Sequence, residues 1–182
     1  SGVYRTLPIV FHEESAHELY LVCKDLLGNS VEDIETFFVD ATGPNTWSTF
    51  EGPHYSDQYS EWIDGVSTVV INAEDPEPHP SRVETSYYRF ELVDDSYCEG
   101  DEDWQTTPID DESWTVYEEP FSIDEESCHV IESYSIDNLG NIGGVNAHFV
   151  FVDKTPPKTD KDVGTPSLNC SEDPSSCEDD WD

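Results

Sequence analysis

Short runs of β-branched and aromatic residues alternate along the chain with clusters of Gly, Pro, Asn and Asp. Runs of this kind are typical of β-strands bounded by turns. No stretch keeps the 3.6-residue apolar period needed for a helix of three or more turns. The pattern predicts an all-β fold, with strands at 18–24, 34–39, 67–72, 85–93, 129–136 and 147–152.

Turn chemistry separates these strands. The sequences DLLGN at 25–29 and DNLGN at 137–141 predict hairpin turns, because Gly and Asn tolerate positive φ and Asp can accept hydrogen bonds from its own backbone. Residues 74–81 (EDPEPHPS) hold three prolines, which cannot donate to a strand ladder. This segment predicts a stiff surface loop.

The chain contains an internal repeat. Residues 8–29 return as 120–141, with nine of 22 positions identical. After a one-residue insertion, FFVDATGPNT at 37–46 matches VFVDKTPPKT at 150–159. The repeat predicts three parts: 1–42 is the C-terminal part of one module, 43–154 is a complete module, and 155–182 is a linker with the acidic start of a next module.

The run HVIESYSIDNLGN, preceded by SYYRF and WTVYEEPFSI and followed by FVFVDKTPPKT, resembles the OmpL47-type immunoglobulin-like repeats of large bacterial and archaeal surface proteins. The resemblance implies immunoglobulin-like β-sandwich modules in tandem, linked by the TPP segment and without catalytic residues, so no enzyme is expected. In the first linker, residues 41–44 (ATGP) replace the double proline, so the resemblance does not extend to the stiffness of that junction.

Charge and cysteine content narrow the function classes. The 42 acidic and seven basic residues give a net charge of −35, which repels nucleic acid and anionic membrane surfaces. No apolar run approaches the roughly 18 residues of a membrane span. The chain has no methionine, so we expect a processed protein or an excerpt.

The five cysteines lack zinc-ligand spacing and predict disulfides, hence an extracellular or cell-surface location. We expect Cys98–Cys128 and Cys170–Cys177 to pair. Cys23 has no repeat-derived partner, because Ala16 stands where the complete module has Cys128. Asn169 lies in an N-glycosylation sequon, which agrees with export.

Clustered carboxylates suggest Ca²⁺ as a cofactor, although no EF-hand spacing is present. The candidate ligands in one loop are Asp94, Asp95, Asp101 and Asp103, with Glu99 and Glu102 beside them. A second acidic group lies in the tail, at Glu172, Asp173, Glu178, Asp179, Asp180 and Asp182. The alternative interpretation is a solvated acidic surface suited to salt water.

Two other groups of residues have a structural and a functional interpretation. His17 and His129 recur in the motif EES-x-H, which favours a repeat-signature residue that hydrogen-bonds locally over a duplicated catalytic or zinc site. Trp104, Trp114 and Tyr117 suit either a sugar-stacking platform or a sandwich core. The sequence has no GxSxG motif that would indicate a hydrolase.

These features favour a structural subunit or segment of an extracellular prokaryotic surface assembly, such as a filament, sheath or S-layer, with an archaeal source expected. Its partners would be copies of itself or neighbouring repeats, with the tail of one copy completing the N-terminal half-module of the next, head to tail. The alternatives are an adhesin or carbohydrate-binding module, and an accessory domain of a secreted hydrolase.

Overall fold

The computed structural model describes residues 6, 8–100 and 103–162. Over these residues the chain is built from strands and a single short helix. The strands are β1 (Ala16–Lys24), β2 (Ser30–Phe38), β3 (Asn45–Glu51), β4 (His54–Ser56), β5 (Glu61–Ile63), β6 (Thr68–Glu74), β7 (Val83–Leu92), β8 (Thr115–Val116), β9 (Cys128–Asp137) and β10 (Asn146–Val152). The helix α1 (Asp95–Cys98) follows β7, and no helix in this part of the chain is long enough to cross a membrane.

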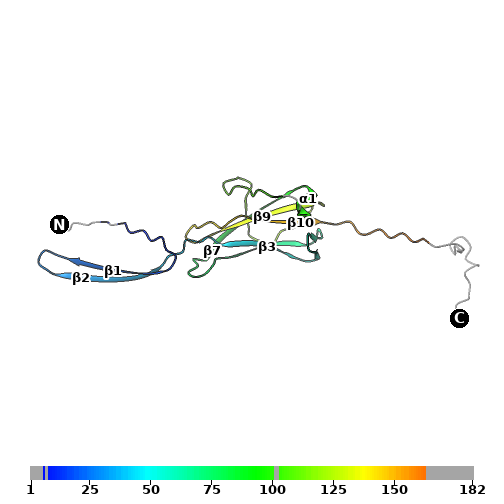
Figure 1. Cartoon of the computed structure of the whole chain (residues 1–182). Coiled ribbons are helices and arrows are strands. Elements are labelled where there is room, and N and C mark those ends of the chain that lie inside the picture. The colour runs from blue at the N-terminus through cyan, green and yellow to red at the C-terminus, as the bar shows by residue number, and fades with distance from the viewer. Residues whose placement is uncertain (1–5, 7, 101–102, 163–182) are drawn as a thin grey trace, which may run out of the picture.

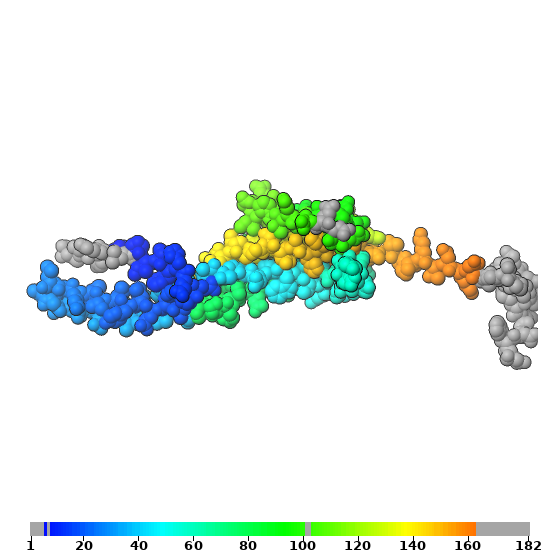
Figure 2. Space-filling view, in the orientation of Figure 1, coloured from blue at the N-terminus to red at the C-terminus, as the bar shows by residue number. Residues whose placement is uncertain are grey.

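The strands form two bodies of different kind (Figure 1). Strands β1 and β2 make an antiparallel hairpin that projects from one end of a compact module built from β3 to β10. Residues 155–162 leave the module at the opposite end. The space-filling view shows the hairpin as an arm beside, rather than within, the body of the module (Figure 2).

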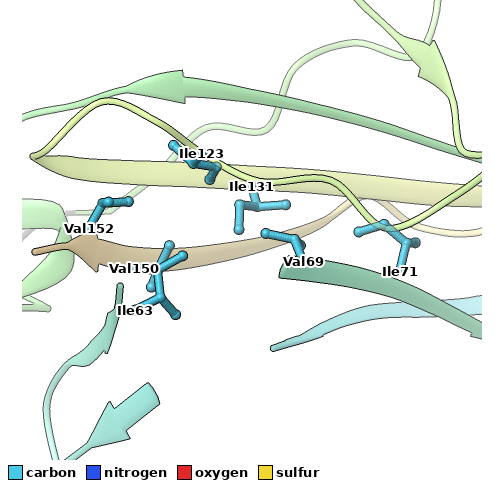
Figure 3. Close-up of a cluster of buried hydrophobic side chains, with 7 residues drawn as sticks. All are labelled: Ile63, Val69, Ile71, Ile123, Ile131, Val150 and Val152. Atoms are coloured by element: carbon cyan, nitrogen blue, oxygen red, sulfur yellow. The ribbon is translucent and has the colours of Figure 1, made fainter. Parts of the chain in front are cut away.

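The module has two facing layers. One is a six-stranded sheet in the order β4-β5-β10-β9-β7-β8, and the other is the pair β3-β6. All neighbouring strands are antiparallel except β5 and β10. Between the layers lies a small aliphatic core (Figure 3), composed of Ile63, Val69, Ile71, Ile123, Ile131, Val150 and Val152. The predicted all-β fold is confirmed.

Strand β9 is the most buried element, since every residue except Ile136 is shielded from solvent. Side chains alternate between the two faces of a strand. Ile131 points into the aliphatic core, whereas Glu132 and Tyr134 point to the opposite face, which the segment 103–114 covers. The apolar pattern of this strand identifies no single buried face, because both faces of β9 are covered.

Glu132 sits at the centre of that second face, fully buried. Its carboxylate accepts hydrogen bonds from Trp104 Nε1 at 2.9 Å and from the Thr107 backbone N–H at 2.8 Å, and it pairs with the Arg89 guanidinium at 2.5 Å. Burial acts to raise the pKa of Glu132, but the hydrogen bonds from Thr107, Trp104 and Arg89 outweigh it and hold the pKa below its usual value.

The predicted disulfide between Cys98 and Cys128 is confirmed. It joins the end of α1 to the first residue of β9, and both cysteines are buried. The bond therefore ties the end of α1, which precedes the covering segment 103–114, to the central strand. Cys23, for which no repeat-derived partner was expected, is an exposed free thiol on β1.

All six predicted strands are present, with bounds shifted by up to four residues. The predicted loop at 74–81 follows the end of β6 at Glu74. Four strands, β3, β4, β5 and the two-residue β8, are not among the six. The inward-facing positions of β3 include Thr46 and Ser48, so its buried face is partly polar, and β4 and β5 have only three residues each.

We expect Glu132→Gln to lower the free energy of unfolding at pH 7 by about 2 kcal/mol, because the variant leaves the Arg89 guanidinium and the donors around it without a buried anion. The folded-state pKa of Glu132 lies below its usual value, so its contribution is present above the usual pKa of Glu, about 4.3, and is lost as the pH falls through the folded-state pKa. Urea unfolding at pH 7 and pH 3 measures this difference.

The matched control is Glu91→Gln, since Glu91 binds the same guanidinium at 2.7 Å but is 42% exposed. Its effect should stay below about 1 kcal/mol. Equal losses for the two variants, or a loss for Glu132→Gln that does not shrink in acid, would contradict the assignment.

Candidate functional site

The β1–β2 hairpin and the β9–β10 pair have the same strand register. His17 lies opposite Phe37 in the hairpin, and the corresponding residues His129 and Val150 lie opposite each other in the module. This agreement extends along the whole length over which β9 and β10 pair. The two stretches that repeat in sequence therefore form the same antiparallel unit in space.

Their surroundings differ completely. In the module, β9 lies between β7 and β10, and the β3-β6 layer covers one of its faces. In the hairpin, β1 pairs with β2 alone, and within the described residues no strand pairs with the outer edge of either. The apolar side chains left at least two-fifths exposed on these two strands are Tyr20, Leu21, Val22, Val31, Ile34 and Phe38. The hairpin therefore leaves apolar side chains uncovered on both of its faces and has two open strand edges.

Only the base of the hairpin is packed. The rings of Phe11, His17 and Phe37 contact one another with centroids 4.7 to 5.7 Å apart. One ring nitrogen of His17 lies 2.8 Å from the Glu13 carbonyl oxygen, and one of His129 lies 3.1 Å from the Ser127 carbonyl oxygen. Both repeated histidines hydrogen-bond to nearby backbone at the start of a strand, as the structural interpretation predicts.

The predicted calcium loop does not bring its described carboxylates together. Asp94 caps α1, where it accepts hydrogen bonds from the Ser96 backbone N–H and hydroxyl, which lower the pKa of Asp94. Asp94, Asp95 and Asp103 do not form a three-carboxylate group. Asp101 and Glu102 lie outside the described residues, as do Asn169, Cys170, Cys177 and the acidic residues of the tail.

The three aromatic residues considered for sugar stacking are used in packing. Trp104 donates to Glu132 and contacts the rings of Tyr97 and Phe149. Trp114 donates to the Pro108 carbonyl and stands edge-on against Tyr134. Tyr117 packs against the aliphatic core. Two of the three therefore cover the sheet, the third joins its core, and they do not form a common platform.

Ser48, His148 and Glu61 form a hydrogen-bonded chain that has the composition of a catalytic triad. One ring nitrogen of His148 lies 2.5 Å from Ser48 Oγ, and the other lies 2.7 Å from Glu61 Oε2. Ser48 lies on β3 and is only 7% exposed. The chain links β3 to β10 and β5, which accounts for its geometry without a substrate.

A different carboxylate cluster lies where the hairpin joins the module. Asp40 follows β2, Asp75 follows β6, and Asp137 is the last residue of β9. One carboxylate oxygen of each lies within 4.8 Å of the other two. Sequence reasoning missed this cluster. The available signal was the repeat itself, in which Asp40 corresponds to Asp153 and Asp137 to Asp25.

The fold and these contacts define a β-rich protein with one covered strand pair and one uncovered counterpart. Comparison with protein-family models, with curated proteins and with solved structures gives no match to this chain. The resemblance to OmpL47-type repeats therefore stays a prediction from the sequence.

We expect the backbone amides of β1 and β2 to exchange with solvent far faster than those of β9 and β10 in dilute, unassembled protein. An isolated two-stranded hairpin is marginally stable, whereas the amides of a central strand open only with the whole module. Hydrogen exchange read by NMR should show a difference of about a hundredfold or more between Leu19 and its counterpart Ile131. Similar protection at the two positions would mean that the hairpin is stabilised by itself.

Proposed function

We propose that this chain is a structural subunit or segment of an extracellular prokaryotic surface assembly, such as a filament, sheath or S-layer, in which immunoglobulin-like β-sandwich modules join head to tail. One observation carries the proposal: the hairpin has the register of the central strand pair of the module but lacks everything that covers that pair. A surface of this kind is completed by strands from another module.

The module indicates which strands are missing. Strand β9 has β7 on its outer edge, and β10 has β5 on its outer edge. By the same register, the free edge of β1 would take a β7-like strand and the free edge of β2 a β5-like strand. Such contacts repeat from one module to the next, so they extend in one direction as a fibre does.

The repeat and the residues of β7 restrict which chain segment could supply the β7-like strand. By the repeat offset, 155–182 corresponds to 42–69, a range that includes β3, β4 and β5 but ends before β7. In β7, Arg89 lies opposite Glu132, whose counterpart in β1 is Tyr20. An identical β7 would therefore place Arg89 beside a tyrosine instead of a carboxylate. We infer that a neighbouring repeat of different sequence supplies this strand, while the tail of a second copy suits the β2 edge.

The extracellular setting rests on two supports. A structural disulfide closes the module, and such bonds persist in oxidising compartments. The strongly acidic composition, −35 at neutral pH, keeps single chains apart unless salt or cations screen the charge. Assembly in a saline exterior is consistent with both features, and the mechanism we propose is association rather than catalysis.

Light scattering and negative-stain microscopy in salt test the proposal. We expect Leu21→Glu, which places a charge on the exposed hairpin face, to abolish assembly, because a carboxylate buried against a docked strand has no partner. The matched control is Val66→Glu, which adds the same charge at an exposed position of the module and should leave assembly unchanged.

Deletion of residues 160–182 distinguishes the two sources of strands. Loss of fibres with the module still folded supports completion by the tail of another copy. Fibres that persist after the deletion rule out completion by the tail. Monodisperse particles from the full chain under all salt conditions would contradict the assembly proposal and favour an adhesin or carbohydrate-binding module.

A further inference from the structure

The geometry at the junction of hairpin and module points to a Ca²⁺ site formed by Asp40, Asp75 and Asp137, and we propose that the ion fixes the hairpin to the module. The separation of the carboxylate oxygens, within 4.8 Å of one another, suits a single ion. Two oxygens that bind one Ca²⁺ at 2.3 to 2.6 Å can be at most about 5 Å apart.

Burial makes the cluster unusual in so acidic a protein. Asp137 is fully buried and Asp40 is 8% exposed, while Asp75 is partly buried. The ion pairs of the described residues involve Arg89 and His148, and none reaches these three carboxylates. Like charges withdrawn from water without a cation destabilise the folded state. The site therefore needs either a proton or a metal ion to neutralise part of its charge.

Hydrogen bonds orient the carboxylates but leave one carboxylate oxygen of the cluster without a partner. Asp40 accepts from the backbone N–H groups of Thr42 and Ser81, at 3.2 and 2.8 Å. Asp75 Oδ2 accepts from the Arg82 backbone N–H at 2.6 Å, whereas Asp75 Oδ1 is buried and accepts no hydrogen bond.

A hydroxyl beside the cluster is also poorly satisfied. The side chain of Ser81 is near enough to Asp137 to help lower the pKa of that carboxyl group, yet Ser81 Oγ is buried and makes no hydrogen bond of normal geometry. Two of the four unsatisfied buried side-chain atoms in the described chain, Asp75 Oδ1 and Ser81 Oγ, thus lie at this cluster. Both are oxygens that a cation could use.

The titration of the group agrees with crowded negative charge. Burial is the main reason that the pKa of Asp75 is raised, and the charges of Asp40 and Asp137 add to it. Burial also acts to raise the pKa of Asp137, but hydrogen bonds from Asn141 and Leu139 outweigh it and lower that pKa.

The chemistry favours Ca²⁺ over other ions. All the available donors are hard oxygens, from three carboxylates and a hydroxyl, on segments with no common symmetry. Ca²⁺ accepts six to eight oxygens in irregular arrangements, whereas Mg²⁺ requires near-octahedral geometry. A surface hollow lined by Phe38, Asp40, His79 and Ser81 borders the cluster at Asp40 and Ser81.

The test measures Ca²⁺-dependent melting of the unassembled chain, with Asp75→Asn as the variant and Asp25→Asn as the matched control. Asp25 occupies the same position in its turn as Asp137 does, and its carboxylate accepts hydrogen bonds from the Leu27 and Asn29 backbone N–H groups and from the Asn29 side-chain amide. It is exposed on the hairpin, away from the cluster. Both variants remove one carboxylate. Ionic strength is held constant, and Mg²⁺ replaces Ca²⁺ in a parallel series.

In millimolar Ca²⁺ we expect the melting temperature of the wild-type chain and of Asp25→Asn to rise by about 5 °C, and that of Asp75→Asn to stay unchanged. In chelator, Asp75→Asn should melt at or above the wild-type temperature, because a buried like charge has been removed. A variant that merely damaged the fold would melt lower in both conditions, so the two effects are distinguishable.

A second readout covers the case in which Asp75→Asn fails to fold. In the wild-type chain, Ca²⁺ should slow hydrogen exchange at the Thr42 and Ser81 amides, which donate to Asp40, more than at amides of the Asp25 turn. A Ca²⁺ response that persists in Asp75→Asn, an equal response to Mg²⁺, or no response at Thr42 and Ser81 would overturn the assignment. Assembly plays no part in either readout, so this site and the proposed function fail independently.

Discussion

The burial of β9 on both faces and both edges is the constraint on which the rest of the module depends. Its side chains are mixed in polarity, so each needs a specific partner: Ile131 requires the aliphatic core, Glu132 requires Arg89, and Ser135 bonds to Thr46 at 2.8 Å. The order of the six-stranded sheet, the β3-β6 layer and the covering segment, which follows the disulfide-bonded α1, all meet these requirements. The buried carboxylate of Glu132 permits no other strand register, because a shifted register would bury its charge without a partner.

The hairpin shows what the same unit becomes when that constraint is relaxed. Where β9 has Glu132, Ser133 and Ser135, β1 has Tyr20, Leu21 and Cys23. The substitutions replace groups that need hydrogen-bond partners by groups that need only apolar cover. A docked partner would therefore be held to the hairpin by backbone pairing and apolar contact, and less by side-chain hydrogen bonds. Apolar contact of this kind depends less on the exact sequence of a partner than side-chain hydrogen bonds do.

The sequence could predict the strands whose apolar pattern is strong, and the Cys98–Cys128 pairing beside them, but not the elements held by polar contacts. Strand β3 was not predicted because its inward-facing residues Thr46 and Ser48 are polar. They hydrogen-bond to Ser135 and His148 on the opposite layer. The carboxylate cluster could not be predicted from the sequence for a different reason. Asp94 and Asp95 are neighbours in sequence but do not converge, whereas the cluster joins residues from three distant segments. Proximity along the chain was a poor guide, because ligand geometry depends on which strand ends the fold brings together.

The two ends of the module are stabilised by different means. After β10, Pro156 and Pro157 restrict the backbone directly. After β2, the linker has Gly43 and a single proline in the matching positions, and its direction depends on side-chain contacts: Asp40 with the backbone of Thr42 and Ser81, and the ring of Phe38 against His79 at 4.6 Å. A linker whose direction depends on side-chain contacts changes direction when those contacts change. Because Asp40 holds the linker and also belongs to the acidic cluster, any change in the charge of that cluster acts on the hydrogen bonds that orient the hairpin.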